Sequence, residues 1–277
     1  MAKERIDKLL SHQGFGSRKD IKRLLRSHEV LLNGKQIFDP SLGIDLDTDE
    51  LSVDGEVVTF QREIYLMMNK ITHTVSANKD GEHQTVFDLL APEYRTPYLQ
   101  EKLHLVGRLD MDTEGLLLFT TDGALTHRLI SPKSHIDKIY FVMLEREFSE
   151  DQQADVARRF EEGIAVGPDD NDPGFTCEPA RVGFPSQNEI DAALENSSVG
   201  EVCARLGGGT EILKNPARFA ILTITEGKYH QVKRMFTAVG NKVVFLKRLS
   251  MGGLALDGTL KPGEYRLLNK TELALLR

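Results

Sequence analysis

The residues best suited to chemistry form one short run, Gly107-Arg108-Leu109-Asp110-Met111-Asp112-Thr113-Glu114, in which three acids follow Arg108. A carboxylate can act as a nucleophile, as a general base or as a stabiliser of positive charge. The run is polar and turn-prone, and the apolar segment 116–121 follows it, so we expect a loop next to a strand. Such a loop can be held rigidly and still present a carboxylate to a cleft. On spacing alone, an acid-rich surface turn is the more common explanation.

Strands and helices must position this run, and their sequence patterns predict an α+β domain over residues 61–277 with a large mixed, mostly antiparallel sheet. Apolar runs typical of strands cover residues 64–68, 116–121, 139–144, 219–224 and 242–246. Helical patterns cover residues 123–130, 150–162 and 230–239, and another helix is expected to start within 85–90. Residues 166–218 are rich in Gly, Pro, Asp and Asn and predict a loop-rich insertion with one helix at 188–195.

Length and composition restrict the class of protein. The 277 residues are enough for about two domains, and 40% hydrophobic with 28% charged residues indicates a soluble globular chain. No apolar run approaches the ~20 residues of a membrane span, and the first residues lack the apolar core of a signal peptide. Cys177 and Cys203 make no disulfide framework and have no partners at zinc-ligand spacing. We expect a cytoplasmic monomer without a metal or a membrane partner.

The net charge of −7 hides a strong asymmetry along the chain. Residues 1–35 carry nine Lys/Arg against four acids, and residues 226–250 carry six against one. Residues 36–60 carry seven acids and no Lys or Arg. Because salt confines charge effects to about 10 Å, locally basic faces matter more for phosphate binding than the total charge.

Residues 1–60 predict a small module with one basic helix face. Residues 5–10 form a first helix, and Ser17 with Asp20 is a capping signal for a second helix that ends near Ser27. Asn33-Gly34 predicts a hairpin turn between short strands, and residues 53–58 predict another hairpin. The second helix would bury Ile21, Leu24 and Leu25 and expose Arg18, Lys19, Lys22, Arg23 and Arg26.

Charge alone leaves nucleic-acid binding and a merely solvated helix face about equally favoured. The segments Arg5-Ile6-Asp7-Lys8-Leu9-Leu10, Ser17-Arg18-Lys19 and Val30-Leu31-Leu32-Asn33-Gly34 resemble the S4 RNA-binding domain over residues 3–60. The resemblance implies a module that grips structured RNA largely through phosphates, and so positions the RNA without reading its sequence.

The run around Asp110 also resembles a family signature. Gly107-Arg108-Leu109-Asp110, with Thr113 and Gly115-Leu116-Leu117, is similar to the signature of pseudouridine synthases. Further segments match that family in order: Asp137-Lys138-Ile139-Tyr140, Glu226 to Met235, Leu246 to Leu249, Gly252 to Leu254 and Gly263 to Leu267. With the S4-like module, the chain resembles the bacterial branch that modifies small-subunit ribosomal RNA, except over residues 166–218, which look longer than in that branch.

The resemblance implies roles for individual residues. Asp110 is the catalytic carboxylate, Lys233 the cation that keeps it ionised where many relatives carry Arg, and Tyr140 the ring that packs against a flipped uracil. Arg108 would hold RNA, and Arg234 is a second RNA-binding candidate and the alternative to Lys233 for the cation role. The residue patterns add that His230 and Gln231 are structural or RNA-contacting, that Asp112 and Glu114 are solvent-facing turn acids, and that Lys242, Lys247 and Arg248 bind phosphate or lie on a solvated face.

The implied reaction converts a uridine of small-subunit (16S) ribosomal RNA to pseudouridine, which breaks an N–C bond and forms a C–C bond to the same ring. It needs no redox step, group transfer or metal, so we expect no cofactor, and the partner is ribosomal RNA or an assembling ribosomal particle. Asp110 could act as nucleophile or as base. The alternatives are the same reaction on large-subunit RNA and a non-catalytic RNA-binding assembly factor.

Overall fold

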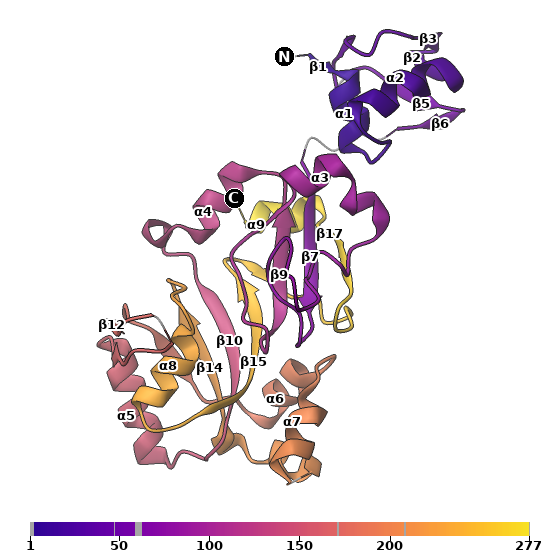
Figure 1. Ribbon diagram of the computed structural model, residues 1–277. Helices are drawn as coiled ribbons and strands as arrows, with labels where there is room; N and C mark the ends of the chain where they lie inside the picture. Colours follow the sequence, from indigo (N-terminus) through magenta and orange to yellow (C-terminus); the bar gives the residue numbers. More distant parts are fainter. Residues whose placement is uncertain (1–2, 47, 59–62, 171, 208, 277) are drawn as a thin grey trace. The chain divides into compact units, whose positions relative to one another are not determined.

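The computed structural model describes residues 3–46, 48–58, 63–170, 172–207 and 209–276. The chain forms two compact units (Figure 1). The first comprises Met1–Ile64, Leu90–His104 and Thr120–Asp122, and the second comprises Tyr65–Leu89, Leu105–Phe119 and Gly123–Arg277. The predicted boundary between residues 60 and 61 lies outside the described residues and stays a prediction.

The first unit packs two helices on short strands. Helices α1 (Ile6–His12) and α2 (Arg18–Ser27) accompany a sheet with the order β3 (Lys35–Gln36), β2 (Val30–Leu32), β5 (Leu51–Val53) and β6 (Glu56–Val57). A second, two-stranded sheet pairs β1 (Glu4–Arg5) with β4 (Gly43–Ile44), and the unit also contains the 3-10 helix η1 (Pro92–Arg95) and α3 (Pro97–Lys102). Its core consists of Ile6, Leu10, Ile21, Leu25, Val30, Leu51 and Val53.

Helix α2 begins and ends where the sequence predicts. The Ser17 hydroxyl accepts a hydrogen bond from the Asp20 backbone N–H, and the Asp20 carboxylate accepts one from the Ser17 N–H at 3.0 Å, which confirms the capping box. Ile21 and Leu25 are buried, whereas the five basic residues of the opposite face are exposed. The basic face is therefore accessible, although Arg23 forms an ion pair with Asp20.

The second unit is built on most of a nine-stranded sheet. Its order is β13 (Arg181–Gly183), β14 (Phe219–Ile224), β10 (Lys138–Leu144), β15 (Val243–Met251), β9 (Glu114–Thr120), β7 (Tyr65–Lys70) and β17 (Tyr265–Leu267). In addition, β16 (Leu254–Ala255) pairs with β15, and β8 (His104–Leu105) pairs with β9. Strands β15 and β9 run parallel, whereas β10 is antiparallel to both β14 and β15. The predicted α+β class with a mixed, mostly antiparallel sheet is confirmed.

The parallel contact between β9 and β15 depends on a glycine. Gly115 pairs with Arg248, and a Cβ atom at Gly115 would lie 2.3 Å from the Arg248 carbonyl oxygen. Gly115 also has φ +99°, a conformation that residues with a side chain rarely adopt. The glycine therefore allows the strand that follows the Asp110 loop to approach β15.

Helices cover both faces of the β13-β14-β10-β15 half of the sheet (Figure 1). Helices α6 (Gln187–Leu194) and α7 (Val199–Leu206) pack on Phe141, Phe219 and Phe245. Helices α5 (Glu150–Glu161) and α8 (Gln231–Ala238) lie on the other face and meet through Phe160 and Phe236, whose ring centroids are 5.3 Å apart. Because side chains alternate along a strand, Tyr140 faces away from Phe141 and towards the α8 side.

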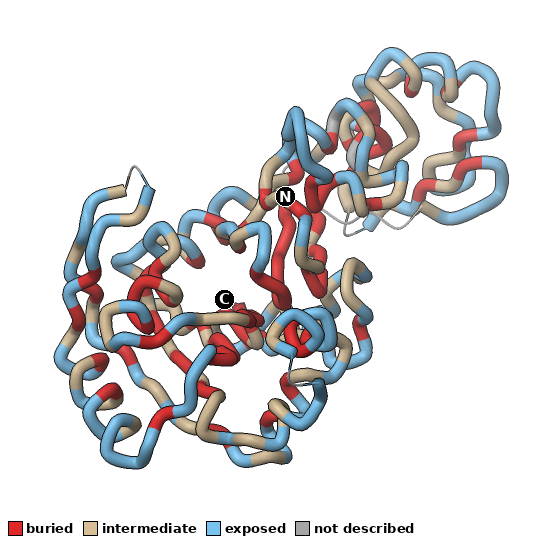
Figure 2. The backbone as a smooth tube through the Cα atoms, turned by 60° about the horizontal axis from the view of Figure 1, so that its bottom comes forward, coloured by how far each residue is buried: buried red, intermediate tan, exposed pale blue. Residues whose placement is uncertain are grey.

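A second core lies beside β9 and β7. Helices α4 (Gly123–Ile130) and α9 (Lys270–Leu275) pack there through Leu125, Leu129 and Leu273. Every residue of β9 is buried, and Figure 2 shows buried residues following such strands while exposed residues occupy the surrounding loops. The strand that follows the Asp110 loop is thus fixed along its whole length.

Two segments differ from the predictions. Residues 85–90 form turns instead of the start of a helix. Thr85 and Asp88 make reciprocal hydrogen bonds like those of a helix cap, but the backbone is extended at Ala91, before Pro92, so no α-helix continues from them. The segment 166–218 is more regular than its composition predicts. It contains the expected helix as α6, and also α7, β13, the strand β12 (Phe175–Thr176), which pairs with β11 (Ala165–Val166), and the 3-10 helices η3 (Gly209–Lys214) and η4 (Pro216–Arg218).

A search of the described residues for a helix long and apolar enough to cross a bilayer finds none.

Candidate active site

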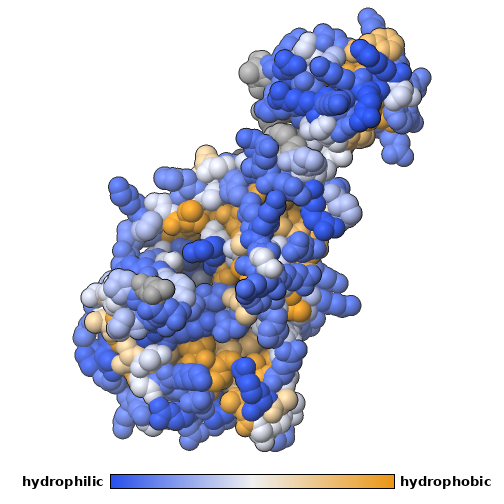
Figure 3. Space-filling model, viewed as in Figure 1, coloured by the Kyte–Doolittle hydropathy of each residue, from blue (hydrophilic) through white to orange (hydrophobic). Residues whose placement is uncertain are grey.

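A pocket that is partly open to solvent lies in the second unit, where the loop before β9 meets β10, β15 and the start of α8. Figure 3 shows that the surface on the viewed side is mostly hydrophilic, with apolar residues in its hollows. Asp110, Tyr140, Lys233 and Arg108 all line the pocket. The structure thus brings the three predicted catalytic residues together, and their catalytic roles stay predictions.

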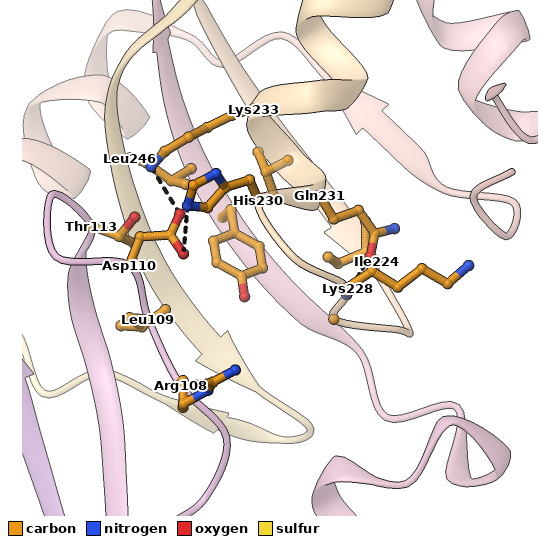
Figure 4. Close-up of a pocket in the computed structure, with 13 residues that line it drawn as sticks. Arg108, Leu109, Asp110, Thr113, Ile224, Lys228, His230, Gln231, Lys233 and Leu246 are labelled. Atoms are coloured by element: carbon orange, nitrogen blue, oxygen red, sulfur yellow. Dashed lines mark hydrogen bonds and ion pairs between the residues drawn. The ribbon is translucent and has the colours of Figure 1, made fainter. Parts of the chain in front are cut away.

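The Asp110 carboxylate lies between two nitrogen-bearing side chains (Figure 4). Lys233 Nζ is 2.8 Å from Asp110 Oδ2, and His230 Nε2 is 3.9 Å from Asp110 Oδ1. Asp110 is 29% exposed and Lys233 is 24% exposed, so the ion pair is largely but not fully removed from water. A half-buried carboxylate with a cation at this distance can remain ionised beside an apolar wall.

Lys233 carries its charge because two acids surround it. Burial alone would lower the pKa of Lys233, but the carboxylates of Asp110 and Asp112 raise that pKa above its ordinary value. Asp112 Oδ1 accepts a hydrogen bond from Lys233 Nζ at 2.6 Å. The ammonium group therefore stays protonated at neutral pH and links the two acids of the loop.

Tyr140 and Arg108 occupy different parts of the pocket. Tyr140 is 7% exposed and lies on β10, between Leu222 of β14 and Arg248 of β15. Arg108 is exposed, and in Figure 4 its side chain extends away from the Asp110 carboxylate. Tyr140 is thus placed as part of the pocket wall, and Arg108 is accessible to a ligand outside it.

The buried side chain of Lys70 holds the loop that carries Asp110. This lysine is fully buried, and its Nζ donates hydrogen bonds to the carbonyl oxygens of Ile71 and Thr113 at 3.0 Å and of Met111 at 3.4 Å. Ser76 Oγ donates to the Leu109 carbonyl at 2.7 Å and accepts from the Leu109 N–H at 3.2 Å. The peptide groups on both sides of Asp110 are therefore held in place.

Lys70 gives the fold a testable pH dependence. Burial lowers the pKa of Lys70 to about 8, although the carboxylates of Asp112, Asp110 and Glu114 counteract part of the shift. Since the unfolded chain holds this proton up to its ordinary pKa, the unfolded state binds more protons between the two values and stability rises with pH there. We expect the free energy of unfolding of the wild type, relative to Lys70→Met, to rise by roughly 3 kcal/mol from pH 7.5 to pH 10.5.

Urea unfolding of both proteins at each pH measures this difference. Lys242→Met, which removes an exposed lysine, serves as the control and should track the wild type. A difference between wild type and Lys70→Met that stays constant with pH would contradict the assignment.

Three predictions about solvent-facing charges are wrong. Glu114 is fully buried, and its carboxylate accepts hydrogen bonds from the Ser198 hydroxyl and from the Ser198 backbone N–H at 3.1 Å. Burial raises the pKa of Glu114, while the Ser198 hydrogen bonds counteract that rise. Lys247 is buried and donates to the carbonyls of Ala193 and Glu195 at 2.9 and 2.8 Å, and Arg248 is buried and donates to the Leu116 carbonyl at 2.7 Å. Backbone carbonyls thus satisfy Lys247 and the Nε of Arg248, whereas Arg248 Nη2 is buried and has no hydrogen-bond partner among the described residues.

Arg234 is engaged inside the protein. It is 6% exposed, and its guanidinium donates to Asp172 Oδ1 at 2.6 Å and to the carbonyl oxygens of Gly167, Pro173 and Tyr229. It also lies over the Phe175 ring, 4.4 Å from the ring centroid. RNA binding by Arg234 stays a prediction, and the structure shows it holding Gly167, Asp172 and Pro173 against α8.

Sequence reasoning did not select Asp169 and Asp170. The Asp169 carboxylate lies 2.7 Å from His230 Nδ1, and the Tyr229 hydroxyl donates to Asp170 at 2.9 Å. Among the described residues, Asp169, Asp170 and His230 could each offer a ligand atom within 4.8 Å of the others. The hydrogen bonds of Asp169 with His230 and of Asp170 with Tyr229 account for this cluster, and we assign no metal to it.

Comparison with known protein families identifies the family of this chain. The profile of the RNA pseudouridylate synthase family matches residues 64–238, a range that contains Asp110, Tyr140 and Lys233. The chain belongs to the RNA pseudouridylate synthase family. The S4 domain profile matches residues 4–49, which include helix α2.

Individual relatives extend over the whole chain. An uncharacterized RNA pseudouridine synthase of Bacillus subtilis is 43% identical over 272 residues, 98% of each chain. The ribosomal small subunit pseudouridine synthases A of Vibrio cholerae and Escherichia coli are 37% and 35% identical over 271 residues, again 98% of each chain. A crystal structure of a pseudouridylate synthase aligns with a TM-score of 0.58 and 32% identity over 99% of both chains. These full-length matches include the segment 166–218.

Proposed function

We propose that this protein isomerises a specific uridine of small-subunit ribosomal RNA to pseudouridine, with Asp110 as the catalytic carboxylate. The observation that carries the proposal is the 2.8 Å ion pair of Asp110 with Lys233 in a pocket that Tyr140 also lines. The choice of the small subunit rests on the full-length similarity to relatives named for that substrate. The same reaction on large-subunit RNA is the second candidate.

The geometry supports a simple division of roles. The Lys233 ammonium stabilises the ionised carboxylate, which could attack C1′ of the ribose or remove a proton as the N–C bond breaks. The Tyr140 ring would pack against the extruded uracil, and a flat ring suits a base that has lost its stacking neighbours. A protein that only binds RNA has no need of a paired carboxylate and cation in a partly buried pocket, which argues against a non-catalytic assembly factor.

Mapping of pseudouridines tests the function. Ribosomal RNA is compared between cells with and without the gene, and the gene is then restored as wild type or as Asp110→Asn. We expect one site in small-subunit RNA to vanish on deletion and to return with the wild type only. A lost site in large-subunit RNA would establish the second candidate, and an unchanged map would refute the enzymatic proposal.

The exposed basic face of α2 carries a prediction about RNA affinity. Changing Lys19, Lys22 and Arg23 to Gln should weaken binding and lower the slope of log K against log salt by roughly two to three, because each lost phosphate contact removes about 0.7–0.9 of slope. Filter binding across a salt series measures both quantities. A control triple variant, with Lys79, Lys214 and Lys270 changed to Gln, removes the same charge from exposed positions of the second unit. Equal losses in the two variants would contradict a specific role for α2.

A further inference from the structure

Three acids of the segment 166–218 lie against the stretch of chain that carries Lys233. Asp169 contacts His230, Asp170 contacts Tyr229, and Asp172 contacts Arg234, at 2.7, 2.9 and 2.6 Å. These three acids therefore bind side chains at the start of α8, next to the pocket. The isomerisation chemistry assigned so far to Asp110, Tyr140 and Lys233 gives these contacts no role.

Besides Lys233, His230 also reaches the Asp110 carboxylate from this stretch of chain. It precedes α8 with φ 48° and ψ 25°, a left-handed conformation that is strained for a residue with a Cβ atom. Its ring stacks on the Tyr229 ring, with centroids 3.8 Å apart and an angle of 22° between the planes. Together with the 2.7 Å contact to Asp169, this stacking fixes the orientation of the ring.

The contact with Asp169 determines which ring nitrogen carries hydrogen. An ionised carboxylate only accepts hydrogen bonds, so His230 Nδ1 must donate to Asp169. In the neutral ring, Nε2 then has no hydrogen, and this nitrogen lies 3.9 Å from Asp110 Oδ1. The ring edge thus limits rotation of the Asp110 carboxylate without offering it a hydrogen-bond donor.

Among the charged groups near Asp110, Lys233 is the one that binds its second oxygen, Oδ2. Lys233 Nζ holds Oδ2 at 2.8 Å and is itself bound to Asp112. Asp170 lies beside the His230 ring and is bound to the Tyr229 hydroxyl. Oδ1 is therefore the Asp110 oxygen that Lys233 leaves available for the ribose or the uracil of a bound nucleotide.

We propose that His230 is a positioning residue for Asp110 and that Asp169 sets its tautomer, which keeps Asp110 Oδ1 free of an internal hydrogen bond. This inference rests on the proposed function. In the opposite tautomer, His230 Nε2–H would donate to Oδ1 and make that oxygen less basic and less nucleophilic. The loop that contains Asp169 thereby becomes part of the catalytic apparatus, although it does not touch the nucleotide.

Two pairs of variants test the assignment. In Asp169→Asn, the amide can donate to Nδ1 and favour the opposite tautomer, so kcat should fall roughly ten- to hundredfold with KM within about twofold. In His230→Asn, the amide nitrogen lies near the Nδ1 position and can still donate to Asp169, but no donor is placed at Asp110 Oδ1. Because the ring that limits rotation of the Asp110 carboxylate is lost, kcat should fall by roughly fivefold, less than in Asp169→Asn. His230→Gln places its amide near the Nε2 position, where it can donate to Asp110, and should resemble Asp169→Asn.

Two readouts are needed. Pseudouridine formation by the full-length protein on ribosomal RNA transcripts gives kcat and KM. Nitrogen-15 NMR of histidine-labelled protein reports the tautomer, and we expect His230 to carry hydrogen on Nδ1 in the wild type and on Nε2 in Asp169→Asn. The matched control is Asp170→Asn, which removes the same charge from the adjacent residue and should keep the wild-type tautomer and kcat.

The inference fails if wild-type His230 carries hydrogen on Nε2, if Asp169→Asn keeps the wild-type kcat, or if Asp170→Asn loses as much activity as Asp169→Asn. Failure of the proposed function looks different, because the wild type itself would then form no pseudouridine in ribosomal RNA. An active wild type with a fully active Asp169→Asn variant would overturn the role of His230 alone.

Discussion

Replacing Asp110 with asparagine is expected to abolish pseudouridine formation while the protein still folds and binds RNA. The amide has the shape of the carboxylate, but it can neither attack C1′ nor take up a proton, and it no longer balances the charge of Lys233. Loss of a group that makes or breaks bonds removes orders of magnitude from the rate, so we expect a fall of roughly 10⁴-fold or more. Single-turnover assays on ribosomal RNA, with enzyme in excess, measure it.

Asp112→Asn is the matched control, because it removes one carboxylate from the same loop and from the same lysine. Asp112 is 67% exposed, and exposed ion pairs contribute little, so its rate should fall by less than about tenfold. Thermal unfolding and filter binding show whether either variant has lost its fold or its RNA affinity. An Asp110→Asn variant that retains a tenth of the wild-type rate would remove Asp110 from the chemistry.

Much of the fold follows from local signals in the sequence. Ser17 and Asp20 form a capping box whose groups are only three residues apart, so the start of α2 can be predicted without knowledge of the rest of the chain. The helical spacing of Leu125 and Leu129 likewise predicts α4 over residues 123–130. Residues 85–90 show the limit of such signals. Thr85 and Asp88 make the same reciprocal hydrogen bonds, but Ala91 is extended before Pro92 and only turns form in between.

Tertiary contacts decide what local patterns cannot. Strand β15 extends to Met251, beyond the predicted end at residue 246, because Lys247 and Arg248 find backbone carbonyl partners inside the fold. A sequence pattern cannot show that such carbonyls will be available, and it therefore favours a solvated face. The prediction for Glu114 is wrong for the same reason, since its partner Ser198 lies in the segment with the weakest periodicity.

The candidate site likewise contains residues that the sequence predicts and one that only the fold brings there. The order of the family segments predicts that Asp110, Tyr140 and Lys233 belong together, and the structure places all three around one pocket. Asp169 lies outside those segments, in a stretch that resembles an ordinary acidic loop. The fold brings it to His230, and only the 2.7 Å contact distinguishes it from its acidic neighbours.

Lys233 is the second position where a single change should have a large effect. In Lys233→Met, the Asp110 carboxylate loses the cation 2.8 Å away, and the ionised form becomes less stable in a pocket that excludes much of the surrounding water. Removal of one preorganised charge partner typically costs 10²- to 10³-fold in rate, so we expect kcat to fall by roughly that factor. RNA affinity should change little, since Lys233 is 24% exposed and its Nζ is already bound to Asp110 and Asp112.

Lys233→Arg separates the charge from its geometry. A guanidinium keeps the positive charge and can contact both oxygens of a carboxylate, so the variant should recover most of the lost rate. Lys242→Met removes an equal charge from an exposed position and should keep the wild-type rate, which controls for the net charge of the RNA-binding surface. If Lys233→Met and Lys242→Met were equally active, the ion pair would have no catalytic role. If Lys233→Arg were as slow as Lys233→Met, catalysis would depend on the shape of the lysine side chain and not on its charge.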